Sequence, residues 1–320
     1  MKKRLILVLL LLCALAFALL HGQREPQQHV LAGKVFGTYY RLVTHEDIAP
    51  LQGEIDQLFA SINQEMSVFE PSSLINQINA APSGASFTLS PALAHLMAES
   101  KRVYELSGGA YDPTVEPLVD LWGFGKSKQQ QEPTPEALAA ALAKVGFNGL
   151  ELSGNKLTKR REGLSLDLSS VAKGYAVDAL AELLTRHGLQ HYIVDIGGEL
   201  KAKGKRDGKH QDWQAGIQAP DEAGVVATMA MPLHNLAVAT SGDYRRVLES
   251  GDTSYSHIIS PKTGLPARSD FASVSVFHPS ALMADIYATA FMTMPAADAI
   301  RLAKEQKLSV IFIPNSPKHP

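Results

Sequence analysis

The stretch Asp167 to Asp178 combines residue types that suit the binding of a phosphate group. An apolar alternation over 164–168 predicts a strand, and helical spacing from Ser170 predicts that a helix follows it directly. The unpaired N–H groups at the start of such a helix attract anions, and Lys173 adds a positive charge there. The alternative is structural: Ser169 or Ser170 caps the helix, and Lys173 is solvated.

Asp285 and Thr289 form a second candidate site, for a metal ion. They are four residues apart in a helix predicted to open at Ala284, so they share one helical face. A carboxylate and a hydroxyl are hard oxygen donors, and two suffice for a Mg²⁺ ion that keeps its waters and takes phosphate oxygens from a substrate. The structural alternative is that Asp285 stabilises the helix dipole from the first turn while Thr289 packs in the core.

Three further segments place polar side chains beside flexible backbone. In segment 108–115, a Gly-Gly pair and a proline flank Asp112, although the same residues also suit a helix stop followed by a turn. In segment 195–199, an acid at a strand end precedes Gly-Gly, which is also typical of a simple turn. His257 precedes the Pro-x-Thr-Gly turn of 261–264, and its alternative is a structural or surface histidine.

The remaining periodicity indicates the elements that must position these residues. Short strands interleave with a few long helices, and hairpin signals such as Gly154-Asn155 favour an α+β fold with largely antiparallel sheet. A loop is expected over 66–76 and a turn over 239–244. Helices are predicted over 48–66, through 93–104, over 134–144, over 170–187 and from 284, and later strands over 191–196, 213–218, 225–231, 236–239, 272–277 and 308–313.

The composition and the N-terminal segment limit the classes of protein to which this chain can belong. The 320 residues carry a formal net charge of −2 and 7% aromatic residues, which makes nucleic-acid binding a poor prospect. Residues 1–22 join a Lys-Lys-Arg flank to sixteen apolar residues, as in a signal peptide or an N-terminal membrane anchor. Either would place the body on the periplasmic side of the inner membrane. Residues 23–28 are expected to form a tether and 29–320 the folded body; Cys13, the only cysteine, excludes an intrachain disulfide.

Eight motifs in order resemble the ApbE family, the Mg²⁺-dependent FAD:protein FMN transferases. The resemblance covers roughly residues 30–313. The motifs occupy 33–38, 66–69, 108–115, 167–178, 195–199, 239–244, 257–264 and 284–289.

The resemblance implies that FAD binds with Mg²⁺ on its pyrophosphate in a cleft between two closely packed α/β lobes. A threonine or serine hydroxyl of an acceptor protein attacks the phosphorus on the FMN side, and AMP leaves. Typical acceptors are flavin-carrying subunits of membrane electron-transfer complexes, such as ion-pumping NADH:quinone oxidoreductases.

The resemblance also implies roles for individual residues. Metal ligands would be Asp285, Thr289 and the main-chain carbonyl of Ser170, and His257 would be the general base. Asp285 would thus take part in catalysis through the metal. FAD contacts would fall on Phe36, Phe69, Ala110, Tyr111, Asp112, Asp167, Lys173 and Ile259.

Two positions depart from the family pattern. Phe36 stands where methionine is usual, and another large apolar side chain preserves packing against the ligand. Ser260 stands where aspartate is common, which removes a charge beside His257. This second departure keeps two other functions open: an exported FAD-binding or storage protein without transfer, and a Mg²⁺-dependent FAD pyrophosphatase that gives FMN and AMP. A purely structural exported domain would require the histidine, aspartate and threonine pattern to be accidental.

Overall fold

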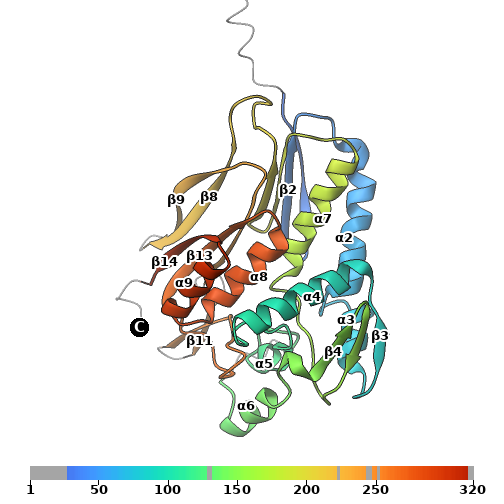
Figure 1. The fold of residues 1–320 in the computed structure, drawn as a ribbon, viewed down its shortest axis with the longest axis vertical. Helices are drawn as coiled ribbons and strands as arrows, with labels where there is room; N and C mark the ends of the chain where they lie inside the picture. Colours follow the sequence, from blue (N-terminus) through green and yellow to red (C-terminus); the bar gives the residue numbers. More distant parts are fainter. Residues whose placement is uncertain (1–26, 128–131, 222–223, 243–246, 251–252, 316–320) are drawn as a thin grey trace, which may run out of the picture.

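A computed structural model describes residues 27–127, 132–221, 224–242, 247–250 and 253–315. A seven-stranded sheet forms its centre (Figure 1), in the spatial order β1 (His29–Val35), β2 (Thr38–Thr44), β6 (Tyr192–Ile196), β7 (Glu199–Lys203), β10 (Ala237–Gly242), β13 (Phe271–His278) and β14 (Ser309–Pro314). Each pair of neighbouring strands within it is antiparallel. This confirms the predicted α+β fold with antiparallel sheet.

Helices cover one face of this sheet. α8 (Ala281–Met292) packs on β10 and β13, and α7 (Ala172–Arg186) packs on β6 and β7 beside it. Apart from Asp285 and Thr289, nearly all side chains of α8 are apolar, and Thr289 is its one residue that is not buried, as expected of a helix at the centre of a core. The amphipathic helices α2 (Gln52–Met66) and α4 (Pro91–Leu106) form the outer layer, against α7 and α8 respectively, and α9 (Ala296–Glu305) also packs on α8.

A two-stranded ribbon lies over the opposite face of the sheet. It consists of β8 (Trp213–Asp221) and β9 (Gly224–Leu233), and Figure 1 shows it on the side away from α7 and α2. Alternate residues of β8, Trp213, Ala215 and Ile217, are buried against the sheet in a second small core with Val43 and Ile193. The sheet is therefore buried on both faces, although the ribbon covers only part of its second face.

A smaller lobe carries the other elements. It contains a three-stranded sheet of β3 (Ser86–Thr88), β5 (Lys156–Lys159) and β4 (Leu150–Ser153), with the predicted hairpin turn at Gly154-Asn155. Around it lie α3 (Leu74–Ala80), α5 (Glu116–Leu121), α6 (Pro135–Leu142), β11 (Val247–Ser250), β12 (Thr253–Ser256) and the 3₁₀ turn η2 (Phe147–Gly149), whereas the 3₁₀ turn η1 (Ala49–Leu51) leads into α2 of the larger lobe. One continuous core joins Phe147 and Leu157 of this lobe to Leu42 and Val194 of the large sheet, so the two lobes pack closely.

Lys159 of β5 forms hydrogen bonds that link α3 to the small sheet. Its side chain is 1% exposed, and its ammonium donates to the carbonyl oxygens of Ile78, Asn79 and Ala81 at distances of 3.3, 2.8 and 2.7 Å. These are carbonyls at the C-terminal end of the helix, where a cation is favoured. Burial lowers the pKa of Lys159. The lysine thus stabilises α3, and side chains of this short helix hold two backbone segments of the candidate site in place.

The structure corrects several predicted boundaries. α3 begins inside the predicted loop 66–76, α8 begins at Ala281 rather than Ala284, and β10 continues to Gly242 through the predicted turn 239–244. Residues 164–168 are extended but form no strand, because a single bridge between Ser165 and Val115 is their only ladder pairing in the described chain.

The predicted leader 1–22 and most of the tether 23–28 lie outside the described residues. Within the described ranges, no helix combines the length and apolar character needed to cross a membrane.

Candidate active site

Helix α7 begins without a side-chain cap of its own. Its N-cap residue is Val171, which makes no capping hydrogen bond, and Ser169 is exposed. The structural alternative, in which Ser169 or Ser170 caps the helix, is therefore wrong. The expected set of unpaired N–H groups is also incomplete, because the Ala172 amide donates to the Leu168 carbonyl at 2.8 Å.

Asp285 of α8 supplies the missing acceptor. The amide of Gly174, in the first turn of α7, donates to Asp285 Oδ2 at 3.0 Å, and the aspartate side chain is almost entirely buried. The negative charge thus stabilises the N-terminal end of α7 rather than that of its own helix. A Cβ atom on Gly174 would lie 2.5 Å from the Ala281 carbonyl oxygen and 2.7 Å from Asp285 Cβ. Glycine is therefore required for the close approach of the two helices.

One face of α8 extends from Asp285 towards another predicted site segment. Asp285, Thr289 and Thr293 follow one another at intervals of four residues. The Thr293 hydroxyl donates to the Ala110 carbonyl at 2.7 Å, and the partly exposed Thr289 lies one turn from each end of the row. The helix therefore connects the start of α7 with segment 108–115. Thr293 was not predicted as a site residue, although the repeated four-residue spacing is visible in the sequence.

Lys173 lies where three motifs meet. Its ammonium forms an ion pair with the buried Glu199 at 3.3 Å, and its side chain is 26% exposed. Gly197, which forms the turn between β6 and β7 with Gly198, has a φ of +61°. A Cβ there would lie 2.9 Å from Thr38 Cγ2 and 3.4 Å from Lys173 Cδ. Segments 33–38, 167–178 and 195–199 are thus adjacent.

Segment 108–115 ends α4 and then builds a rigid turn. Gly108 and Gly109 have φ values of +60° and +82°. The Gly109 amide donates to the Tyr104 carbonyl at 2.8 Å, which ends the helix. Asp112 Oδ1 accepts from the Thr114 hydroxyl at 2.6 Å and its amide at 2.8 Å, while Oδ2 accepts from the Phe147 amide at 3.1 Å. Burial raises the pKa of Asp112. These hydrogen bonds show that the Asp112 side chain stabilises the turn, whether or not it also contacts a ligand.

Tyr111 is a buried residue at the centre of segment 108–115. Its hydroxyl shares a hydrogen bond of 3.1 Å with Ser100. Burial raises the pKa of Tyr111, and the negative charges of Asp285, Asp112 and Asp167 act in the same direction.

Asp167 is held by a backbone contact and by a side chain that was not predicted. The Asp167 amide donates to the Pro113 carbonyl at 2.8 Å. One residue earlier, Leu166 exchanges both of its backbone hydrogen bonds with the Asn79 amide side chain, at 2.7 and 2.9 Å. Asn79 therefore replaces the strand partner that 164–168 lacks. No local sequence pattern identifies a contact across 87 residues.

Phe69 lies beside a cavity of about 570 Å³ in the smaller lobe. The phenyl ring is 58% exposed, which is unusual for a large apolar side chain and suits a stacking surface. Asn76 fixes its loop by donating to the carbonyls of Val68 and Glu70 at 2.9 and 2.7 Å. Lys126 also lines this cavity and donates to Asn76 Oδ1 at 2.9 Å. Neither polar residue was predicted.

Phe36 occupies the turn between β1 and β2. Its φ of +48° is rare for a residue other than glycine, and its half-buried ring packs edge-on against Phe59 of α2 with centroids 5.7 Å apart. A strained backbone at this position indicates that the ring is held in place by the surrounding structure.

His257 and Ile259 belong to a segment that packs on α5. The His257 ring meets Phe124 edge-on, with centroids 6.4 Å apart, and Ile259 is buried with Leu118 and Trp122. The Trp122 indole donates to the Gly264 carbonyl at 2.8 Å. Because α5 directly follows segment 108–115, this packing connects the predicted base to the rest of the site.

The site residues offer oxygen donors for a cation, a lysine for an anion, and two partly exposed aromatic rings on separate loops. A dinucleotide with a pyrophosphate carries chemical groups that match each of these.

Comparison with known proteins agrees with the sequence resemblance. A sequence model described as the ApbE family matches residues 36–312. A FAD:protein FMN transferase of Haemophilus influenzae is 35% identical over 314 residues, which cover 94% of this chain and 90% of that protein. The FAD:protein FMN transferase of Vibrio cholerae is 36% identical over 303 residues, with 92% and 90% covered.

Solved structures give the same result. The flavin transferase ApbE from Vibrio cholerae superposes with a TM-score of 0.82 at 35% identity, covering 91% of this chain and 94% of that chain. The apo form of flavinyl transferase ApbE from Pseudomonas stutzeri gives 0.83 at 32%, covering 92% and 94%. With most of its length matched in both sequence and structure, the chain belongs to the ApbE family.

Proposed function

We propose that this protein is a FAD:protein FMN transferase that flavinylates a threonine or serine of an acceptor protein. The observation that carries the proposal is the buried Asp285 carboxylate, held on the first turn of α7 next to Lys173. In a member of the ApbE family this places a potential metal ligand beside a cation, as transfer from a pyrophosphate requires.

The proposed reaction exchanges a phosphoanhydride bond of FAD for a phosphoester bond to the acceptor. The acceptor hydroxyl oxygen forms a bond to the phosphorus on the FMN side of FAD, and the bond from that phosphorus to the bridging oxygen breaks. AMP departs with the bridging oxygen, and the hydroxyl proton passes to a base. No oxidation or reduction takes place.

The residues present fit a Mg²⁺ ion. Asp285, Thr289 and the Ser170 carbonyl provide only oxygen donors, which Mg²⁺ prefers. In the described chain, no group of three or more acidic, histidine or cysteine side chains forms a metal cage. The small number of protein donors matches an ion that also binds substrate oxygens, where its charge would offset that of the pyrophosphate.

The other site residues would bind and orient FAD. Lys173 would face a phosphate, while Phe36 and Phe69 offer apolar surfaces for the ring systems. Segment 110–112 and Asp167, joined through Pro113, would form the wall between them. Ile259 would add an apolar contact beside the predicted base.

Ser260 preserves the turn after His257 despite its missing charge. Its hydroxyl accepts weakly from the Thr263 amide at 3.4 Å, and its carbonyl accepts from the Gly264 amide at 2.8 Å. An aspartate side chain would accept at the same place. The substitution therefore keeps the backbone that presents His257, which supports transfer over simple storage of FAD.

The test is transfer to a defined acceptor. The full chain is incubated with FAD, Mg²⁺ and the soluble domain of a flavin-carrying NADH:quinone oxidoreductase subunit. The expected result is a fluorescent acceptor heavier by one FMN unit, with AMP in equal amount and no product in excess EDTA. Free FMN with an unmodified acceptor would instead identify a pyrophosphatase, and FAD binding without either product would identify a storage protein.

His257 provides a separate prediction. If His257 accepts the hydroxyl proton, His257→Ala should slow transfer by on the order of 10²- to 10⁴-fold and leave the Kd for FAD near that of the parent. Single-turnover transfer and FAD fluorescence titration measure the two effects. His210→Ala is the control, because His210 is an exposed residue in the loop between β7 and β8. A parallel loss of FAD affinity would assign His257 to binding instead.

We further propose that the body lies on the periplasmic side of the inner membrane, anchored or released by residues 1–22. The Lys-Lys-Arg flank and the sixteen-residue apolar run support this location. The proposed acceptors are membrane complexes, so the same location would bring enzyme and acceptor together.

A further inference from the structure

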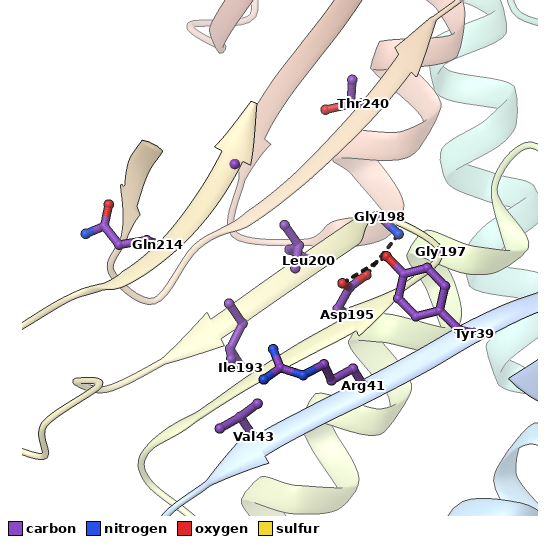
Figure 2. Close-up of a pocket in the computed structure, with 11 residues that line it drawn as sticks. Tyr39, Arg41, Val43, Ile193, Asp195, Gly197, Gly198, Leu200, Gln214 and Thr240 are labelled. Atoms are coloured by element: carbon purple, nitrogen blue, oxygen red, sulfur yellow. Dashed lines mark hydrogen bonds between the residues drawn. The ribbon is translucent and has the colours of Figure 1, made fainter. Parts of the chain in front are cut away.

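A second cavity lies on the face of the large sheet opposite α7 and α8. It has a volume of about 480 Å³ and lies between the sheet and strand β8 (Figure 2). Tyr39, Arg41 and Val43 of β2 project into it together, since alternate residues of a strand share one face. We call this space the β8 groove. It contains none of the residues predicted to bind FAD or Mg²⁺.

Among the described residues that line the β8 groove, Arg41 is the one cation. Figure 2 shows its guanidinium extending along the sheet towards Ile193. Within the described ranges, the Arg41 side chain makes no hydrogen bond or ion pair, although Asp195 is its cross-strand neighbour. Asp195 accepts from the Tyr39 hydroxyl at 3.2 Å and the Gly198 amide at 2.9 Å. The five guanidinium donors are therefore available to a carboxylate from outside.

Strand β8 gives the β8 groove a backbone edge. β8 pairs with β9 alone, so one of its two edges lacks a strand partner in the described chain. Of the described residues, none from β9 lines the groove, whereas Gln214 and Gly216 of β8 do, which indicates that the edge of β8 not taken by β9 borders the groove. Unpaired strand edges bind extended polypeptides through main-chain hydrogen bonds.

One end of the β8 groove leads to the candidate active site. Gly197 and Gly198 line the groove, and they form the turn that contacts Lys173 on the other side. A Cβ on Gly197 would lie 3.4 Å from Lys173 Cδ. Because neither glycine has a side chain, a polypeptide lying in the groove can cross this turn at close range.

We propose that the β8 groove binds an extended segment of the acceptor protein, with a carboxylate of that segment on Arg41 and its hydroxyl residue crossing Gly197-Gly198 toward Lys173. The proposal rests on the proposed function. The mixture of one free guanidinium, apolar side chains and a bare strand edge fits a polypeptide with an acidic residue better than a small anion.

The test separates acceptor binding from FAD binding and from chemistry. The probe is the soluble acceptor domain of a flavin-carrying NADH:quinone oxidoreductase subunit, and the enzyme is the full chain. Arg41→Glu is expected to raise the KM for the acceptor about 10-fold or more, with the Kd for FAD unchanged. Arg41→Gln, which removes the positive charge without adding a negative one, should show a smaller rise. Lys209→Glu is the control, because Lys209 is exposed in the loop between β7 and β8.

Direct binding of the acceptor domain in the absence of FAD distinguishes the two proposals. Weaker binding to Arg41→Glu than to the parent supports the groove even if the parent transfers no FMN, an outcome that would reject only the transferase assignment. Unchanged acceptor binding and KM in Arg41→Glu would overturn the groove. A loss of FAD affinity in this variant would also overturn it, because the cavity would then belong to the FAD site.

Discussion

Replacing Asp285 by alanine is expected to reduce transfer by roughly 10²- to 10⁴-fold, the equivalent of several kcal/mol of transition-state stabilisation. The side chain is the only carboxylate among the proposed metal ligands. It also accepts the Gly174 amide, so its removal leaves a buried N–H group without that partner, at a cost of about 1–3 kcal/mol in the free energy of unfolding. Steady-state transfer rates and thermal unfolding measure both effects.

Asp285→Asn separates the two contributions of this residue. Asparagine retains an oxygen that accepts the Gly174 amide but has no negative charge. We therefore expect a melting temperature close to that of the parent together with a transfer rate nearly as low as that of the alanine variant. Titration with Mg²⁺ should show weakened metal dependence in both. An asparagine variant with full activity at the ordinary Mg²⁺ concentration would remove Asp285 from the proposed metal site.

Gly174→Ala is expected to disrupt the same helix contact from the other side. The added methyl group would meet the Ala281 carbonyl and Asp285 Cβ at distances well inside van der Waals contact, and both lie on a buried helix with little room to move. Overpacking of this kind costs about 1–3 kcal/mol or more in the free energy of unfolding. Because the displaced helix carries Asp285 and Thr289, transfer should fall as well. Chemical denaturation and transfer assays check the two expectations.

Gly53→Ala is the matched control for that change. Gly53 also lies in the first turn of a helix, α2, and no atom lies within 4 Å of where its Cβ would be. This substitution should be neutral or stabilise the protein by up to about 1 kcal/mol, since alanine restricts the unfolded chain. Equal effects of the two substitutions would show that the approach of α7 and α8 is looser than the structure indicates.

The amino-acid sequence alone determined most of the long helices and strands, and the family. Helical spacing identified α2 and α4, and the Thr134 cap followed by Pro135 identified the start of α6, whereas the Ser90 cap that begins α4 was not predicted. These features depend on residues within a few positions of one another, which a local pattern records. The order of the eight motifs also identified the ApbE family without knowledge of their positions in space.

Only the tertiary structure decided how the motifs combine. Gly174 and Asp285 are 111 residues apart, and Asn79 and Leu166 are 87 apart, so no local periodicity relates them. The start of α7 illustrates the difference. Its sequence predicted a serine cap or an open anion site, whereas packing of α8 against it provides an aspartate instead. Helix ends need a partner, and burial in the core determined which residue became that partner.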